Sequence, residues 1–165
     1  MTAPEAQPLE RLVAQTRERY RRLAQETLPA LAAQNQEVAN AEPKLAGLNE
    51  KLAAHIRREE ELLYPILLQM IAAPEPKTNA DGSLCTTAPC RFCTVGHTLF
   101  LFEQEHATLN ALAGELAQAL KGAAAETAAK ALAEELATLT RIEDDAIFPR
   151  TIQLERKLKG LPATR

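Results

Sequence analysis

The stretch HIRREEELLYP, residues 55–65, recurs as LTRIEDDAIFP, residues 139–149, and the two copies align without a gap. Each copy has a glutamate followed by two more acidic residues, two aliphatic residues, an aromatic residue and a proline. In the first copy His55 and Glu59 stand four residues apart, so on a helix they share one face at about 6 Å. With this spacing, a helix of a bundle can offer both an imidazole and a carboxylate to a metal ion.

The second copy of the repeat keeps only part of this pair. It retains the carboxylate as Glu143 but has Leu139 in the position of the histidine. The repeat therefore predicts a metal-binding helical bundle that has lost part of its ligand set.

Length and composition favour one helical domain over residues 1–165. The chain has six glycines and no tryptophan, and its formal net charge is -3 with acids and bases interspersed. This charge pattern indicates neither nucleic acid nor an anionic membrane as a partner. The opening MTAPEAQPLERL lacks the apolar core of a signal peptide, and the most apolar stretch, residues 62–71, is too short to span a bilayer. A cytoplasmic protein is expected.

Helical periodicity predicts the architecture. Four stretches carry apolar residues at the spacing of an amphipathic helix. They span approximately residues 9–31, 45–66, 99–116 and 125–158. Long helices with mostly short joints predict an all-α, up-down-up-down antiparallel four-helix bundle without a β-sheet. Pro29, Pro65 and Pro149 are expected to kink their helices.

Polar residues interrupt three of these apolar stripes. They are His55, Glu59, His106 and Glu143. Buried polar groups must find partners, so each is satisfied within the core, is turned toward solvent, or binds a metal. Their positions on matching stripes favour one common site. Two imidazoles and two carboxylates suffice, with a water, for one iron, zinc or manganese ion.

The order of these motifs resembles the hemerythrin-like superfamily, in particular the repair-of-iron-centres (iron–sulfur cluster repair) di-iron proteins. Four segments are similar to the four bundle helices of that family, in order: PLERLVAQTRERYRRLAQETLPAL, HIRREEELLYP, FEQEHATLNAL and IEDDAIFPR. The resemblance covers nearly the whole chain apart from a cysteine-bearing loop. It implies two irons, with one histidine from each helix and a bridging glutamate from the second and the fourth.

Carried over residue by residue, this resemblance leaves two ligand positions substituted. The positions that match the family are His55, Glu59, His106 and Glu143. The first-helix histidine falls on Arg21 and the fourth-helix histidine on Leu139. Neither side chain ligates iron, because a guanidinium is always cationic and leucine has no donor atom. The expectation is therefore a reduced core site that holds one metal ion rather than two.

Arg21 also permits a metal-free interpretation. A cation in place of the metal could neutralise Glu59 and Glu143 through charge-assisted hydrogen bonds. The alternative is that Arg21 belongs to a solvated basic face of the first helix. The other members of that face would be Arg17, Arg19 and Arg22.

The loop between the second and third helices, residues 73–97, carries a second candidate metal site. Within it, CTTAPCRFCTVGH supplies Cys85, Cys90, Cys93 and His97. Three thiolates and one imidazole make a complete tetrahedral zinc set. The alternatives are unligated thiols, with His97 on the third helix, a redox pair from Cys90 and Cys93, or an iron–sulfur cluster.

Three functions follow from these patterns. The first is a non-enzymatic hemerythrin-like metal-binding protein, for which the resemblance implies a role in iron handling or in nitrosative or oxidative stress. The second is a metal-free bundle that binds a protein partner, with the zinc-stapled loop as its recognition element. The third is a di-iron protein that reacts with O₂ or NO. The chain shows no nucleophile–base pair, phosphate loop or glycine-rich motif of another enzyme class.

Overall fold

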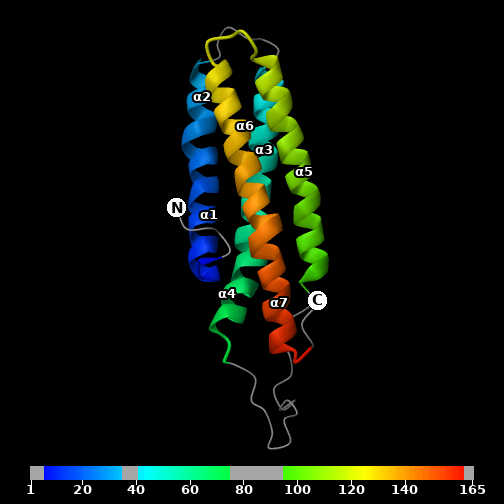
Figure 1. Ribbon diagram of the computed structural model, residues 1–165. Helices are drawn as coiled ribbons and strands as arrows, with labels where there is room; N and C mark the ends of the chain where they lie inside the picture. The colour runs from blue at the N-terminus through cyan, green and yellow to red at the C-terminus, as the bar shows by residue number, and fades with distance from the viewer. Residues whose placement is uncertain (1–5, 35–40, 75–94, 162–165) are drawn as a thin grey trace, which may run out of the picture.

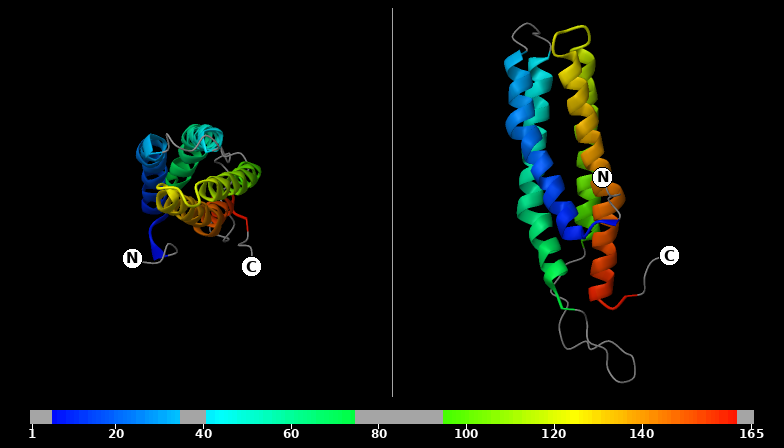
Figure 2. Two further views of the ribbon diagram at one scale, coloured as in Figure 1. Left: turned by 90° about the horizontal axis from the view of Figure 1, so that it is seen from above. Right: turned by 60° about the vertical axis from the view of Figure 1, so that its left-hand side comes forward.

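The computed structural model describes residues 6–34, 41–74 and 95–161. All regular structure in these residues is helical and none of it is strand, which confirms the all-α prediction. The helices form four long rods that lie side by side (Figure 1), and the end-on view of Figure 2 shows the four rods around a common interior. No helix in the described part of the chain is long and apolar enough to cross a membrane.

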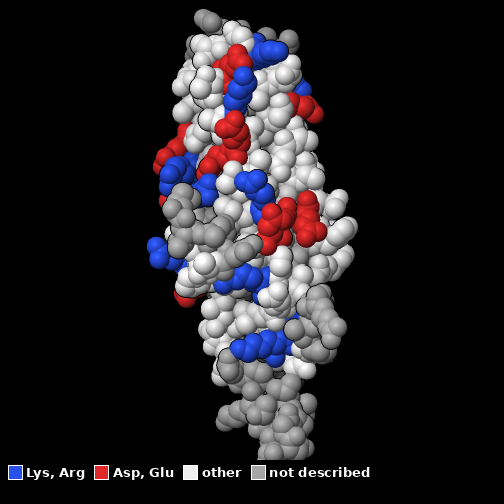
Figure 3. Space-filling model, viewed as in Figure 1, with Lys and Arg blue, Asp and Glu red and all other residues white. Residues whose placement is uncertain are grey.

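Each rod is either one α-helix or two α-helices joined through a single π-helical turn. In chain order the rods are α1 (Leu9–Arg22), η2 (Leu23–Thr27) and α2 (Leu28–Gln34); α3 (Glu42–Arg58), η3 (Glu59–Leu63) and α4 (Tyr64–Ala72); α5 (Gly96–Ala119); and α6 (Glu126–Ile142), η4 (Glu143–Ile147) and α7 (Phe148–Leu158). The four predicted stretches fall one in each rod. On the face seen in Figure 3, acidic and basic side chains are interspersed over these helices.

The π-helical turns occur where the sequence places a proline inside a helix. Pro29, Pro65 and Pro149 each stand two residues after the end of such a turn, whereas α5 contains neither a proline nor a π-helical turn. Proline lacks an N–H, and its ring collides with the carbonyl four residues earlier in an α-helix. An inserted residue relieves this collision. The break expected at each proline therefore takes the form of a π-helical turn.

Two of these turns begin at a candidate ligand. The N–H of Tyr64 donates to the carbonyl of Glu59, and the N–H of Phe148 donates to the carbonyl of Glu143. In a π-helical turn the residue five places along returns to the same side of the helix. Tyr64 and Phe148 are therefore buried together with the two glutamates, and their rings pack between the helices.

The interior consists of two apolar clusters with a polar layer between them. The upper cluster includes Tyr20, Leu52, Leu109 and Leu139, and the lower cluster includes Leu63, Tyr64, Phe102 and Phe148. Along each rod the chain passes from one cluster to the other. In three rods the crossing point is a candidate ligand, so the polar residues form one layer across the bundle.

A glycine lies within the short connection between α5 and α6. Gly122 has a φ of 81°, which is in the left-handed region. A side chain there would strain the backbone even though the space around the Cα is open.

Replacing Gly122 with alanine should therefore lower the free energy of unfolding by about 1–2 kcal/mol. Gly114 is the matched control, because it lies exposed inside α5 with open space around it. Gly114→Ala should raise the free energy of unfolding by roughly 0.5–1 kcal/mol. Urea denaturation of the two variants measures both changes, and equal effects of the two substitutions would contradict the expectation.

Candidate metal centre

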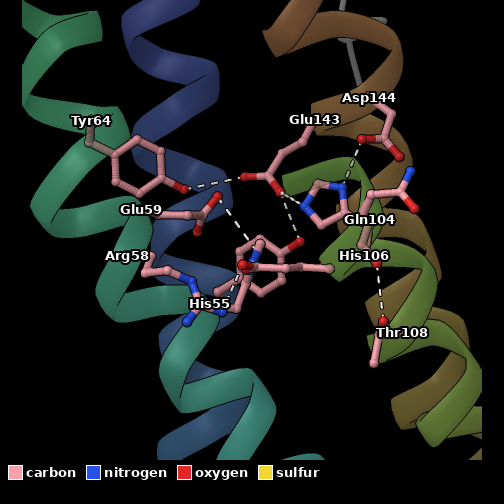
Figure 4. A network of polar contacts seen from close by, with 11 residues as sticks. His55, Arg58, Glu59, Tyr64, Gln104, His106, Thr108, Glu143 and Asp144 are labelled. Carbon is pink, nitrogen blue, oxygen red and sulfur yellow. Dashed lines mark hydrogen bonds and ion pairs between the residues drawn. The ribbon is translucent and has the colours of Figure 1, made fainter. Parts of the chain in front are cut away.

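The structure brings the four predicted core ligands together. His55 on α3, Glu59 at the start of η3, His106 on α5 and Glu143 at the start of η4 are all buried. Each offers one ligand atom, and these atoms all lie within 4.8 Å of one another. Figure 4 shows the side chains converging from three different rods.

Both imidazoles are held by an acid on the neighbouring rod. Nδ1 of His55 lies 3.0 Å from Oε2 of Glu105, and Nδ1 of His106 lies 2.7 Å from Oδ1 of Asp144. Arg58 in turn contacts the other oxygen of Glu105 at 2.8 Å. Carboxylates in this position orient metal-binding histidines and make them more basic. Each ring therefore directs its Nε2 toward the centre of the layer.

Two buried atoms at this centre, Nε2 of His55 and Oε1 of Glu59, have no hydrogen-bond partner. Nε2 of His106 lies 3.0 Å from Oε2 of Glu143, which makes an ion pair when the imidazole is protonated. Each buried polar atom without a partner costs about 1–3 kcal/mol. A cation bound among these atoms would satisfy the first two and would also contact the His106 nitrogen.

The distances between donors match those of ligands that share one ion. Two ligand atoms about 2.1 Å from an ion are about 3.0 Å apart at a right angle and about 3.4 Å apart at a tetrahedral angle. Nε2 of His106 lies 3.0 Å from Oε2 of Glu143, and Nε2 of His55 lies 3.7 Å from Oε1 of Glu59. The donor set therefore fits a metal ion with little rearrangement.

Two tyrosines complete the polar layer. The hydroxyl of Tyr20 donates to Oε2 of Glu143 at 2.9 Å, and the hydroxyl of Tyr64 donates to Oε1 of the same carboxylate at 3.3 Å. Both tyrosine side chains are buried. Burial and the charge of Glu143 raise the pKa of both phenols well above the usual value. Glu143 is thus the residue that most of the layer contacts.

Arg21 does not neutralise the core carboxylates. Its Nε donates to Oε1 of Glu60 at 2.9 Å, and its side chain is 43% exposed. Arg17 lies 3.7 Å from the same Glu60 oxygen. The residue of α1 that faces the centre is Tyr20, one position before the one expected. The prediction that Arg21 belongs to a solvated basic face is the one that fits, and Leu139 is fully buried.

The ionisable groups of the layer shift one another's pKa. Burial and the neighbouring Glu143 charge raise the pKa of Glu59 well above its usual value. Burial alone would also raise the pKa of Glu143, but the hydrogen bond and the charge of His106 hold it below its usual value. Burial lowers the pKa of His106, yet Asp144 and Glu143 together raise it to about 9. Without a metal, therefore, the surroundings of Glu59 favour its protonated form, and protonated His106 pairs with Glu143.

Sequence reasoning missed the two acids that orient the imidazoles. Glu105 directly precedes His106, and Asp144 directly follows Glu143, so each was adjacent to a predicted ligand. Each acid contacts a histidine on a different rod: Glu105 contacts His55, and Asp144 contacts His106. These pairs depend on which rods are neighbours, which the sequence does not show.

Of the four predicted zinc ligands, only His97 lies among the described residues. Cys85, Cys90 and Cys93 lie outside the described residues. His97 lies in the first turn of α5 and is exposed. The zinc site remains a prediction.

Comparisons with protein-family models, curated proteins and solved structures found no match. The resemblance to the hemerythrin-like superfamily therefore rests on the sequence motifs alone.

The charge of Asp144 should control the protonation of His106. Replacing Asp144 with asparagine removes the charge beside Nδ1 and should lower the pKa of His106 by roughly one to two units. An NMR titration of the imidazole nitrogens in metal-free protein measures this change. Asp145→Asn is the control, because Asp145 is the adjacent acid and is exposed.

The same shift gives the metal-free fold a pH dependence. Because the pKa of His106 rises from 6.5 to about 9 on folding, its protonation stabilises the fold fully below pH 6.5, and this contribution is lost as the pH rises through 9. Asp144→Asn should shrink that loss. An unchanged pKa of His106 in Asp144→Asn would contradict the assignment.

Proposed function

We propose that this chain is a non-enzymatic, hemerythrin-like protein that binds one metal ion in the core of an up-down-up-down bundle. The observation that carries the proposal is the convergence of four buried ligand atoms within 4.8 Å of one another, two of which, Nε2 of His55 and Oε1 of Glu59, have no hydrogen-bond partner. The order in which the rods enter the two apolar clusters supports the antiparallel arrangement. The resemblance suggests a role in iron handling or in nitrosative or oxidative stress.

The size of the layer favours one ion over two. Ligands on opposite sides of one ion are about 4.2 Å apart, since each lies about 2.1 Å from it. The ligand atoms of all four residues lie within 4.8 Å, close to that limit. The fourth-rod position that could supply another nitrogen holds Leu139, which has no donor. A di-iron centre that reacts with O₂ or NO is accordingly the less favoured proposal.

The donor types admit several metals. Two imidazoles and two carboxylates suit ferrous iron, zinc or manganese. For a divalent ion, the two carboxylates of Glu59 and Glu143 supply a matching charge. Binding requires displacement of the proton on Glu59 and of the proton on His106, so metal uptake should release protons.

A metal-free bundle that acts as an interaction module is the second candidate. Its support is the contact of Nε2 of His106 with Glu143 at 3.0 Å, together with the two tyrosine hydrogen bonds to that carboxylate. These contacts neutralise Glu143 without a metal. They leave the unpartnered atoms of His55 and Glu59 unexplained, and for this reason the metal-binding proposal is preferred.

Metal content separates the two candidates. Metal-free protein supplied with ferrous iron or manganese should take up about one ion per chain, measured by elemental analysis after gel filtration. With zinc, the core ion is the part of the uptake that is lost in Glu59→Gln, because the predicted loop site would also bind zinc. Glu59→Gln keeps the shape of the side chain but removes a charged donor. Its dissociation constant should rise by more than about 100-fold, because even the loss of an outer partner costs 10–100-fold.

Glu60→Gln is the matched control for this experiment. Glu60 is the next residue, and it contacts Arg21 and Arg17 at the surface rather than the centre. Its variant should bind metal like the parent. If folded parent protein binds none of the three metals, or if Glu59→Gln binds them equally well, the metal-binding proposal fails.

A further inference from the structure

We propose that Tyr20 is a fifth ligand of the core site and that its phenolate oxygen makes the site selective for a trivalent ion, ferric iron above all. This inference rests on the proposed function, because it requires an ion among His55, Glu59, His106 and Glu143. It assigns a metal-binding role to a residue type that was not among the predicted ligands.

The Tyr20 hydroxyl donates a hydrogen bond to a candidate ligand atom, at a distance that adjacent ligands of one ion would also have. Its oxygen lies 2.9 Å from Oε2 of Glu143, and this oxygen lies 3.0 Å from Nε2 of His106. Adjacent ligands about 2.1 Å from one ion are about 3.0 Å apart at a right angle. The Tyr20 ring also packs edge-on against the ring of His55, with 5.4 Å between centroids. Tyr20 therefore borders both the nitrogen and the oxygen donors.

Tyr20 is also the residue through which the first rod reaches the centre. Among the buried side chains of α1, Tyr20 and Thr16 alone carry a polar atom. The hydroxyl of Thr16 donates to the carbonyl of Leu12 in its own helix at 3.0 Å, so it is not directed at the site. With Tyr20 included, all four rods contribute a donor to the layer.

Charge balance gives the selectivity. A buried site is stable only when its charges are matched. The carboxylates of Glu59 and Glu143 balance a divalent ion, so Tyr20 then remains a neutral hydrogen-bond donor to Glu143. A trivalent ion requires one further negative charge, which the phenolate of Tyr20 provides. Coordination forms one metal–oxygen bond, breaks the phenol O–H bond and releases one proton to the buffer.

A ferric titration tests this assignment. Metal-free protein is titrated with ferric nitrilotriacetate and, separately, with zinc chloride, while the visible spectrum and the metal content are recorded. The ferric protein should show a visible phenolate-to-iron charge-transfer band and, on resonance Raman excitation in that band, tyrosinate ring vibrations. The zinc protein should bind its ion without colour.

Two variants identify the tyrosine. The chain has two tyrosines, Tyr20 and Tyr64. Tyr64→Phe should keep the band, which assigns it to Tyr20 without any change at Tyr20 itself. Tyr20→Phe should still bind one iron per chain but lose the band. Its preference for ferric iron over zinc should fall by at least about tenfold, which corresponds to about 1.4 kcal/mol, because the charge of the phenolate is lost.

The outcomes separate this inference from the proposed function. Ferric protein without a band, or loss of the band in Tyr64→Phe, overturns the ligand role of Tyr20 while metal binding stands. Retention of the band in Tyr20→Phe overturns it as well. Folded parent protein that binds neither ferric iron nor zinc overturns both.

Discussion

The burial of the Glu143 carboxylate is the constraint on which the rest of the layer depends. An ionised carboxylate inside an apolar core is stable only when hydrogen-bond donors or opposite charges surround it. Tyr20, Tyr64 and His106 meet this requirement from the other three rods. The relative positions of the four rods along the bundle therefore depend on Glu143. A shift of any rod by one turn would remove one of its contacts and leave the buried carboxylate without that partner.

Backbone geometry and site chemistry are linked through the prolines. Pro65 and Pro149 are incompatible with a regular α-helix, and the resulting π-helical turns begin at Glu59 and Glu143. The extra residue in the second rod lets Tyr64 reach Glu143 from the same face that carries Glu59. The same turn in the fourth rod places Phe148 under His106, where the two rings stack at 5.5 Å. A feature that first suggests a helix kink thus places the aromatic ring that lies against one side of the candidate metal site.

Much of this arrangement could be predicted from the sequence, because apolar residues that recur at helical spacing indicate which side of each helix is buried. The stripes placed His55, Glu59, His106 and Glu143 in the core, where they are found. The first-helix position carried over to Arg21 lies at the surface, where Arg21 pairs with Glu60, and Tyr20 faces the layer instead. Alignment to a remote motif does not resolve such a rotation of a helix, which is about 100° per residue. Glu105 and Asp144 were missed for another reason. Their partners lie on adjacent rods, and a one-dimensional pattern carries no information on which rods are neighbours.

The two copies of the repeat hold different residues at their first position, His55 and Leu139, without a difference in secondary structure. The two copies share a π-helical turn, an aromatic residue and a proline, so the backbone is the same whether the first position holds His55 or Leu139. Leu139 extends the upper apolar cluster, and burial of a leucine stabilises the fold by about 1.5–3 kcal/mol without any need for a partner. A histidine there would instead need hydrogen-bond partners or a metal for its two ring nitrogens. Leucine in place of imidazole leaves no unsatisfied atom behind, and if the layer binds an ion as proposed, the residues that remain, Tyr20 among them, set the choice of ion.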